Sequence, residues 1–237
     1  MSEYRASLFR NGTSEDASLA ASPSLERLRV EIARIERAGA AAGAPAGLPL
    51  GWETVDDAFP DGVLAATGVH EAAGPAAHGF ALRILARCKG PVMWVHPARS
   101  RWALYGPGLA RLGGALAGRL VVVRARSRDE GLWAAEEGLR SGALDGLALE
   151  PDGPIDLTAS RRLQLAAEAG GALGLLLTGA QGGAAGAAVA PSAVASRWRI
   201  EPAPADISGP ATTPRWRATL IRRRGGGSGE WLVEAPG

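Results

Sequence analysis

Residues 67–81 read TGVHEAAGPAAHGFA. Thr67–Ala73 is a short apolar segment with strand character, and Pro75–Cys88 has the spacing of an amphipathic helix. Gly74 and Gly79 enclose four residues, which is the frame of a phosphate-binding loop. A strand, a glycine loop and a helix in this order predict the first unit of an α/β sheet.

The same alternation continues along residues 49–178. Strands that are apolar on both faces and separated by helices indicate a parallel sheet with helices on both sides. The sequence therefore predicts an α/β fold, in which a twisted parallel sheet is covered by helices. The further strands expected are Val92–Val95, Leu120–Val123, Leu144–Leu149 and Leu173–Thr178, and the further helices are Leu104–Leu112, Ser127–Arg140 and Thr158–Glu168.

The last part of the chain has a different pattern. Residues 179–192 consist mostly of Gly and Ala and predict a loop. Residues 193–237 are predicted to form an antiparallel β extension of the sheet, because the period of the apolar pattern falls to two. The alternating segments are Arg197–Ile200, Arg215–Ile221 and Trp231–Val233, with a turn at Gly225–Gly229.

The first 48 residues divide into three parts. Residues 1–23 predict a flexible tail, residues 24–38 a helix, and residues 39–48 a linker of Ala, Gly and Pro. The helix carries an apolar stripe that is too short for a stable coiled coil on its own. The stripe therefore packs on its own domain or on another protein, and the sequence leaves both open. Its members are Leu25, Leu28, Ile32 and Ile35.

The composition excludes several classes of protein. A formal net charge of +2 is too small to require nucleic acid as the partner. The single cysteine, Cys88, cannot form an internal disulfide and fits a reducing compartment. Neither a secretory signal nor an apolar run of membrane-spanning length is visible. We therefore expect a cytoplasmic protein with no membrane contact.

The glycine frame lacks the side chains that nucleotide chemistry needs. A working phosphate-binding loop has Lys after its second Gly and then Ser or Thr, but this chain has Phe80 and Ala81. Phe80 either fills the pocket or begins the helix and packs in the core. Both readings predict no catalysis, no catalytic residue, no cofactor and no metal site. The degenerate pocket would consist of Gly74, Pro75, Gly79, Phe80, Ala81 and the strand-end residue Glu150.

The order of elements from Leu48 to Glu234 resembles the RecA-type ATPase core. Residues 50–62 are similar to the segment that precedes the first core strand of RecA. Residues 142–150 look like a Walker B strand, with Glu150 where an Asp normally orients magnesium. After Val92–Val95 such proteins carry a catalytic Glu, where this chain has His96. The resemblance implies a RecA-like parallel sheet that lacks the side chains needed for nucleotide hydrolysis.

Four further segments resemble the ImuA family, a group of RecA-like, SulA-related proteins of the bacterial damage-inducible mutagenesis cassette. The most specific is residues 156–168, DLTASRRLQLAAE. The others are residues 69–74, residues 104–109, and residues 215–217 together with 231–234. The resemblance implies an adaptor in SOS-induced, error-prone translesion DNA synthesis. Its implied partners are ImuB and an alternative C-family DNA polymerase, with RecA as a further candidate.

Two surfaces are candidates for partner binding, namely the apolar stripe of residues 24–38 and a basic C-terminal arm. The arm comprises Arg215, Arg217, Arg222, Arg223 and Arg224. We expect DNA contact to be weak or indirect, because Gly179–Ala190 carries no charged residue to meet phosphates. Alternative functions are a SulA-like SOS cell-division inhibitor and a RecA-like DNA-dependent ATPase. The ATPase is disfavoured by Phe80 and Ala81.

Overall fold

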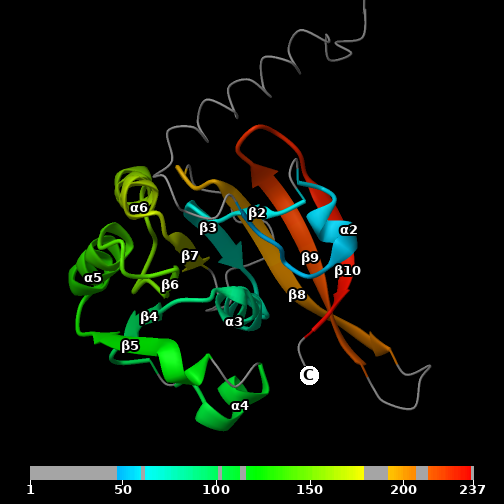
Figure 1. The fold of residues 1–237 in the computed structure, drawn as a ribbon, viewed down its shortest axis with the longest axis horizontal. Helices are drawn as coiled ribbons and strands as arrows, with labels where there is room; N and C mark the ends of the chain where they lie inside the picture. The colour runs from blue at the N-terminus through cyan, green and yellow to red at the C-terminus, as the bar shows by residue number, and fades with distance from the viewer. Residues whose placement is uncertain are drawn as a thin grey trace, which may run out of the picture.

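The computed structural model describes residues 47–59, 62–100, 103–112, 116–178, 192–206 and 213–235. Among these residues an eight-stranded sheet has the order β10-β9-β8-β3-β7-β6-β4-β5 (Figure 1). The neighbours from β8 to β5 are parallel, whereas β9 and β10 are antiparallel. The strands are β3 (Gly68–Ala73), β4 (Val92–Pro97), β5 (Leu120–Ala125), β6 (Gly146–Leu149), β7 (Leu173–Thr178), β8 (Ser196–Asp206), β9 (Thr213–Arg223) and β10 (Gly229–Glu234).

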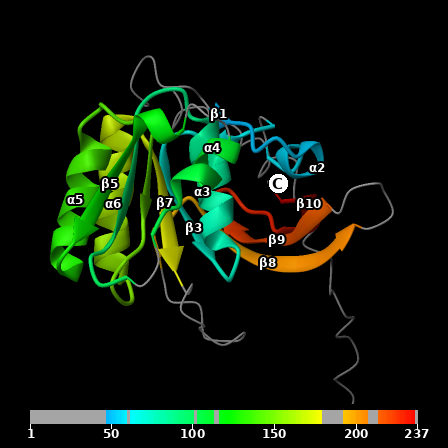
Figure 2. The same ribbon diagram turned by 90° about the horizontal axis from the view of Figure 1, so that it is seen from below.

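Helices cover the two faces of this sheet (Figure 2). On one side lie α3 (Ala77–Arg87) and α4 (Gly106–Arg111), and on the other lie α5 (Arg128–Arg140) and α6 (Leu157–Gly170). The prediction of an α/β fold with a mostly parallel, helix-covered sheet and an antiparallel C-terminal extension is confirmed. The shorter elements are β1 (Gly47–Leu48), α2 (Glu53–Asp56), β2 (Leu64–Ala65) and a 3-10 turn, η1 (Ala117–Arg119).

Each face of the sheet has its own hydrophobic core. Trp94 and Val95 follow one another in β4, point to opposite faces and are both fully buried. The core on the α3 side also includes Val55 of α2 and inward-facing residues of the antiparallel strands, while α5 and α6 close the second core. Burial on both faces is why the central strands lack polar alternation.

Capping residues fix the starts of the two long helices on the second face and the end of one of them. Ser127 accepts a hydrogen bond from the backbone N–H of Glu130 at the start of α5 (3.2 Å). Asp156 accepts one from the N–H of Ala159 at the start of α6 (2.7 Å). Gly171, with φ of 70°, ends α6 in the left-handed conformation. None of the helices in the described ranges is long and apolar enough to cross a membrane.

Several element boundaries differ from those expected from sequence. Gly47–Leu48, placed in the linker, pairs with β2 as a short strand. Helix α3 begins at Ala77, two residues later than expected. Strand β6 begins at Gly146 instead of Leu144, and the Asp145 carboxylate just before it accepts a hydrogen bond from the backbone N–H of Lys89 (2.9 Å).

An aromatic cluster joins the antiparallel extension to α3. Phe80 stacks on Trp52, with ring centroids 6.1 Å apart, and lies 5.5 Å from Trp198 of β8. Trp52 meets Trp216 of β9 edge-on at 6.3 Å, and Trp198 lies 6.2 Å from Trp231 of β10. The cluster therefore connects the segment before α2 with α3 and all three C-terminal strands.

Candidate functional site

The loop after β3 packs against β8. Gly74 has a φ of 103°, and a Cβ atom there would collide with the carbonyl oxygen of Ile200. The same oxygen accepts a hydrogen bond from the backbone N–H of Ala76 (3.2 Å), while Pro75 is exposed. A loop amide of the kind that holds phosphate in nucleotide-binding loops thus joins this loop to the sheet.

The second glycine of the frame lies inside a helix. Because α3 begins at Ala77, Gly79 is a helical position and the loop after Gly74 is short. A Cβ atom on Gly79 would lie 2.8 Å from the indole of Trp216. Gly79 therefore allows β9 to approach α3 closely, which is a packing role.

Phe80 and Ala81 are both fully buried. The Phe80 ring lies between Trp52 and Trp198 in the aromatic cluster. The sequence left two readings of Phe80, one in which the ring fills the pocket and one in which it packs in the core. The position of the ring corresponds to core packing. A side chain at position 80 points into the hydrophobic core of this face.

Glu150 lies at the carboxyl edge of the sheet, directly after β6. It is 6% exposed, and its Oε2 atom is 3.6 Å from Nε2 of His78 in α3. The His78 ring stacks on Trp94 of β4 with a centroid distance of 6.1 Å. His96, two residues beyond Trp94 and therefore on the same face, is also buried. The structure thus places His78 beside Glu150, the strand-end residue of the degenerate pocket.

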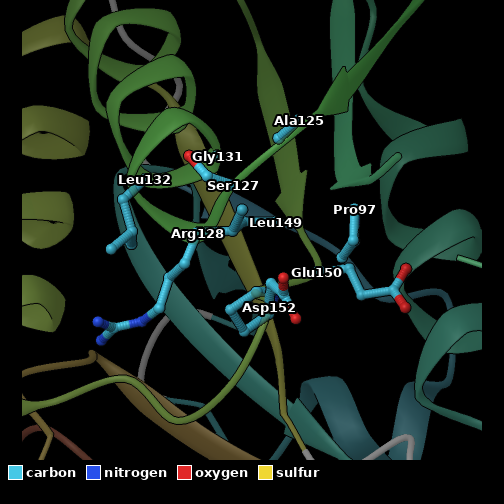
Figure 3. Close-up of a pocket in the computed structure, with 10 residues that line it drawn as sticks. Pro97, Ala125, Ser127, Arg128, Gly131, Leu132, Leu149, Glu150 and Asp152 are labelled. Carbon is cyan, nitrogen blue, oxygen red and sulfur yellow. The ribbon is translucent and has the colours of Figure 1, made fainter. Parts of the chain in front are cut away.

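A small pocket opens nearby, at the carboxyl ends of β4, β5 and β6 (Figure 3). The chain leaves β4 toward α4 on one face and β6 toward α6 on the other, and ligands of open α/β sheets bind at such points. Two side chains beside the pocket are already engaged: Asp152 pairs with Arg99, and Arg128 donates to the carbonyl oxygen of Pro154 (2.9 Å). In Figure 3 the Arg128 guanidinium lies away from the Glu150 carboxylate. We assign no ligand to this pocket.

Metal-binding side chains do not converge in the described part of the chain. Within those ranges, His, Cys, Asp and Glu side chains form no group of three or more that could hold an ion. Cys88 is buried, and burial raises the pKa of its thiol to about 11. A thiol with so high a pKa is a poor nucleophile at neutral pH.

The basic C-terminal arm is split between the two ends of β9. Arg215 and Arg217 lie near its start, where Arg217 Nε is 3.8 Å from Glu230. Their neighbour Trp216 points to the core, as the alternation of the sequence predicts. Arg222, Arg223 and Arg224 lie at its end.

Each arginine of this second group has a local contact. Arg222 donates to the carbonyl oxygen of Ser192 (3.1 Å), Arg223 lies over the ring of Phe59 (5.6 Å), and Arg224 pairs with Glu168 (3.1 Å). These contacts position the arginines, and their partner-binding role stays a prediction. The other candidate surface, formed by Leu25, Leu28, Ile32 and Ile35, lies outside the described residues.

Sequence reasoning missed a buried ion pair across three strands. Glu71 of β3 contacts Arg197 of β8 (2.8 Å) and accepts a hydrogen bond from Thr178 of β7 (2.8 Å). An acidic residue inside an apolar strand was the available signal, since such a residue needs a partner when buried. Gln164 of α6 is a second buried polar side chain that sequence reasoning missed. Its side-chain oxygen accepts a hydrogen bond from the backbone N–H of Val69 (2.8 Å).

His70 forms a buried hydrogen-bonded chain on the other face of β3. Its Nε2 atom lies 3.0 Å from the carbonyl oxygen of Ala65 and its Nδ1 atom 2.7 Å from Ser196 Oγ, which accepts a bond from Trp198 Nε1. These partners fit a neutral ring that donates from Nε2 and accepts at Nδ1. Burial lowers the pKa of His70 to about 4.

The lowered pKa of His70 predicts that the folded protein loses stability in acid. In the unfolded chain the His70 ring takes up a proton near pH 6.5, whereas in the folded chain it is protonated only near pH 4. The contribution of His70 to stability is therefore complete above about pH 6.5 and is lost as the pH falls, by about 2 kcal/mol at pH 5. Urea unfolding at neutral pH and at about pH 5 measures this loss. The His70→Asn variant should lose less over the same interval, and an equal loss in both proteins would contradict the prediction.

Comparisons with known proteins identify relatives. Protein ImuA of Caulobacter vibrioides strain NA1000 / CB15N is 40% identical over 212 residues, covering 79% of this chain and 83% of the relative. Protein ImuA of C. vibrioides strain ATCC 19089 / CIP 103742 / CB 15 gives the same values. No protein-family model matches the chain.

Proposed function

The chain belongs to the ImuA family, and on this premise we propose that it is a non-catalytic adaptor in DNA-damage-induced, error-prone translesion DNA synthesis. Family membership connects it with the ImuA/ImuB mutagenesis system in general. More specifically, we propose that the protein works in the cytoplasm, where it binds ImuB and an alternative C-family DNA polymerase. RecA is a further candidate partner, and contact with DNA is weak or indirect.

The observation that carries the non-catalytic part of the proposal is the position of Phe80. Its ring is fully buried in the aromatic cluster at the place where a nucleotide-binding loop needs Lys. The Gly74 loop packs on Ile200, and Gly79 packs on Trp216. These contacts support a fold in which the nucleotide-binding elements have become structural.

Tagged co-purification from DNA-damaged cells tests the adaptor role. We expect ImuB and the C-family polymerase to be recovered with the full-length chain, as identified by mass spectrometry. Recovery of the tubulin-like division protein without polymerases would instead favour the SulA-like alternative. Recovery of neither class would contradict the proposal.

The apolar stripe supplies variants for the same experiment. Replacing Leu28 and Ile32 by Asp should abolish partner recovery if the stripe is the interface, because a charge on each turn removes the apolar contact. Replacing Glu31 and Arg34 by Ala is the matched control, since both lie off the stripe. Unchanged recovery with the Asp variant would exclude the stripe as the interface.

A hydrolysis assay tests the absence of catalysis. The purified chain should release no more phosphate from ATP, with or without single-stranded DNA, than its Glu150→Gln variant. A DNA-stimulated rate that this substitution removes would establish the ATPase alternative.

A further inference from the structure

The edge strand β5 combines an open backbone edge with exposed apolar side chains. Among the described strands it pairs only with β4. Val121 and Val122 are 49% and 46% exposed, and consecutive side chains point to opposite faces. Neither helical layer therefore covers this part of the strand. The sequence had predicted a fully buried strand here, because three consecutive valines look the same at an edge and in the interior of a sheet.

The other edge of the sheet is partly covered. At β10 the indole N–H of Trp52 donates to the carbonyl oxygen of Glu234 (3.1 Å), and α2 lies beside this strand (Figure 1). Exposed edges of native sheets are usually blocked in some such way, because they pair readily with other strands. The edge at β10 is thus partly covered, whereas the edge at β5 is open among the described residues.

The hydrogen bond at the end of β5 shows which backbone groups face outward. The carbonyl oxygen of Ala125 accepts a bond from the N–H of Ala98, which follows β4 (2.7 Å). The backbone groups of Ala125 therefore point toward β4. Because these groups alternate between the two edges from residue to residue, those of Leu120, Val122 and Arg124 point to the open edge.

The charge around this edge is positive. Arg119, Arg124 and Arg126 lie in or beside β5. Arg119 donates to the carbonyl oxygens of Gly90 and Ala86, and Arg124 donates to that of Ala98, so neither charge is neutralised by these contacts. Of these three arginines, only Arg126 has a carboxylate of the described residues within ion-pair distance, that of Glu130 (3.2 Å). Pairing of β5 with a second copy of itself would bring these arginines close together, which is unfavourable. A strand that carries Asp or Glu would instead be attracted.

We propose that β5 is a docking edge for an extended segment of a partner protein, with apolar residues at its centre and acidic residues beside them. The segment adds a strand next to β5 and covers Val121 on one face and Val122 on the other. This inference goes beyond the adaptor role by assigning a surface and its recognition chemistry. It holds whether or not the partner is a polymerase.

The variant Val122→Pro provides a sharp test. Proline removes the outward N–H of residue 122 and leaves the ladder to β4 in place, since Val122 does not bond to β4. The control Val122→Thr keeps the N–H and a β-branched shape. The probe is a displayed library of segments of about ten residues, drawn from the proteins of the same genome and selected on the full-length chain.

We expect the selected segments to be acidic and apolar. Val122→Pro should weaken the best synthetic segment by about tenfold or more, and Val122→Thr by much less. Bound segment should slow hydrogen exchange at Leu120, Val122 and Arg124. A second variant, Arg124→Glu, should weaken binding by reversing a charge, and it keeps the test valid if the proline variant does not fold.

Four results would overturn the inference. They are the selection of no segment, the selection of basic segments, equal binding by the proline variant and the wild type, and self-association of the chain through β5. Each can occur while polymerases still co-purify with the chain, so the docking edge and the adaptor role can fail separately.

Discussion

Replacing Phe80 by Lys, the substitution that would restore a phosphate-binding lysine in the sequence, is expected to unfold the protein without creating a nucleotide site. Removing a buried phenylalanine ring alone costs about 3 to 5 kcal/mol. Lysine adds the cost of an ammonium group placed between Trp52 and Trp198. Since domains are stable by only about 5 to 15 kcal/mol, little folded protein should remain.

Circular dichroism and urea unfolding measure this effect, with nucleotide binding tested in parallel. The control Phe80→Leu keeps an apolar side chain and should remain folded with a smaller loss of stability. A folded Phe80→Lys protein that binds ATP would show that position 80 can reach a nucleotide pocket. That result would also remove the main support for a non-catalytic role.

Replacing Glu71 by Ala should destabilise the fold by about 3 to 5 kcal/mol. The Glu71 side chain is 12% exposed and that of Arg197 8%, so the substitution leaves a buried guanidinium without this carboxylate. Thr178 also loses its acceptor at Glu71. The free energy of unfolding from urea titrations gives the size of the loss.

The exposed pair of Arg217 and Glu230 is the matched control. Its atoms are 3.8 Å apart and its side chains are 52% and 56% exposed, so Glu230→Ala should cost less than about 0.5 kcal/mol. A similar small loss for Glu71→Ala would mean that the buried pair contributes little, and that the acidic residue in β3 is kept for another reason.

Hydrophobic patterning predicted the fold because this sheet follows simple rules. Apolar runs such as Leu173–Thr178 are buried on both faces, and β7 has the bounds expected from sequence. The period-two pattern of the C-terminal segments likewise located β8, β9 and β10. The lengths of β8 and β9 were underestimated, since pairing across the sheet extends them through residues without alternation, such as Pro202–Ala205.

The candidate site was less predictable, because the spacing of Gly74 and Gly79 does not reveal what each glycine contacts. Both satisfy the loop frame, yet one accommodates a carbonyl group of β8 and the other an indole of β9. Those partners are more than 100 residues away in sequence. Sequence identified the missing lysine correctly, but only the fold shows that an aromatic cluster surrounds the residue in its place.

The aromatic cluster also constrains the order in which the chain can fold during synthesis. Trp52, among the first described residues, contacts Trp216 and donates a hydrogen bond to Glu234. On the ribosome the α3 face therefore stays incomplete until β9 and β10 have emerged, long after Trp52 and α3. The second face, closed by α5 and α6, needs no residue after Val194 for its core. The face closed by α5 and α6 can therefore pack before β9 and β10 have emerged, whereas the face that resembles a nucleotide site is completed only when these two strands are available.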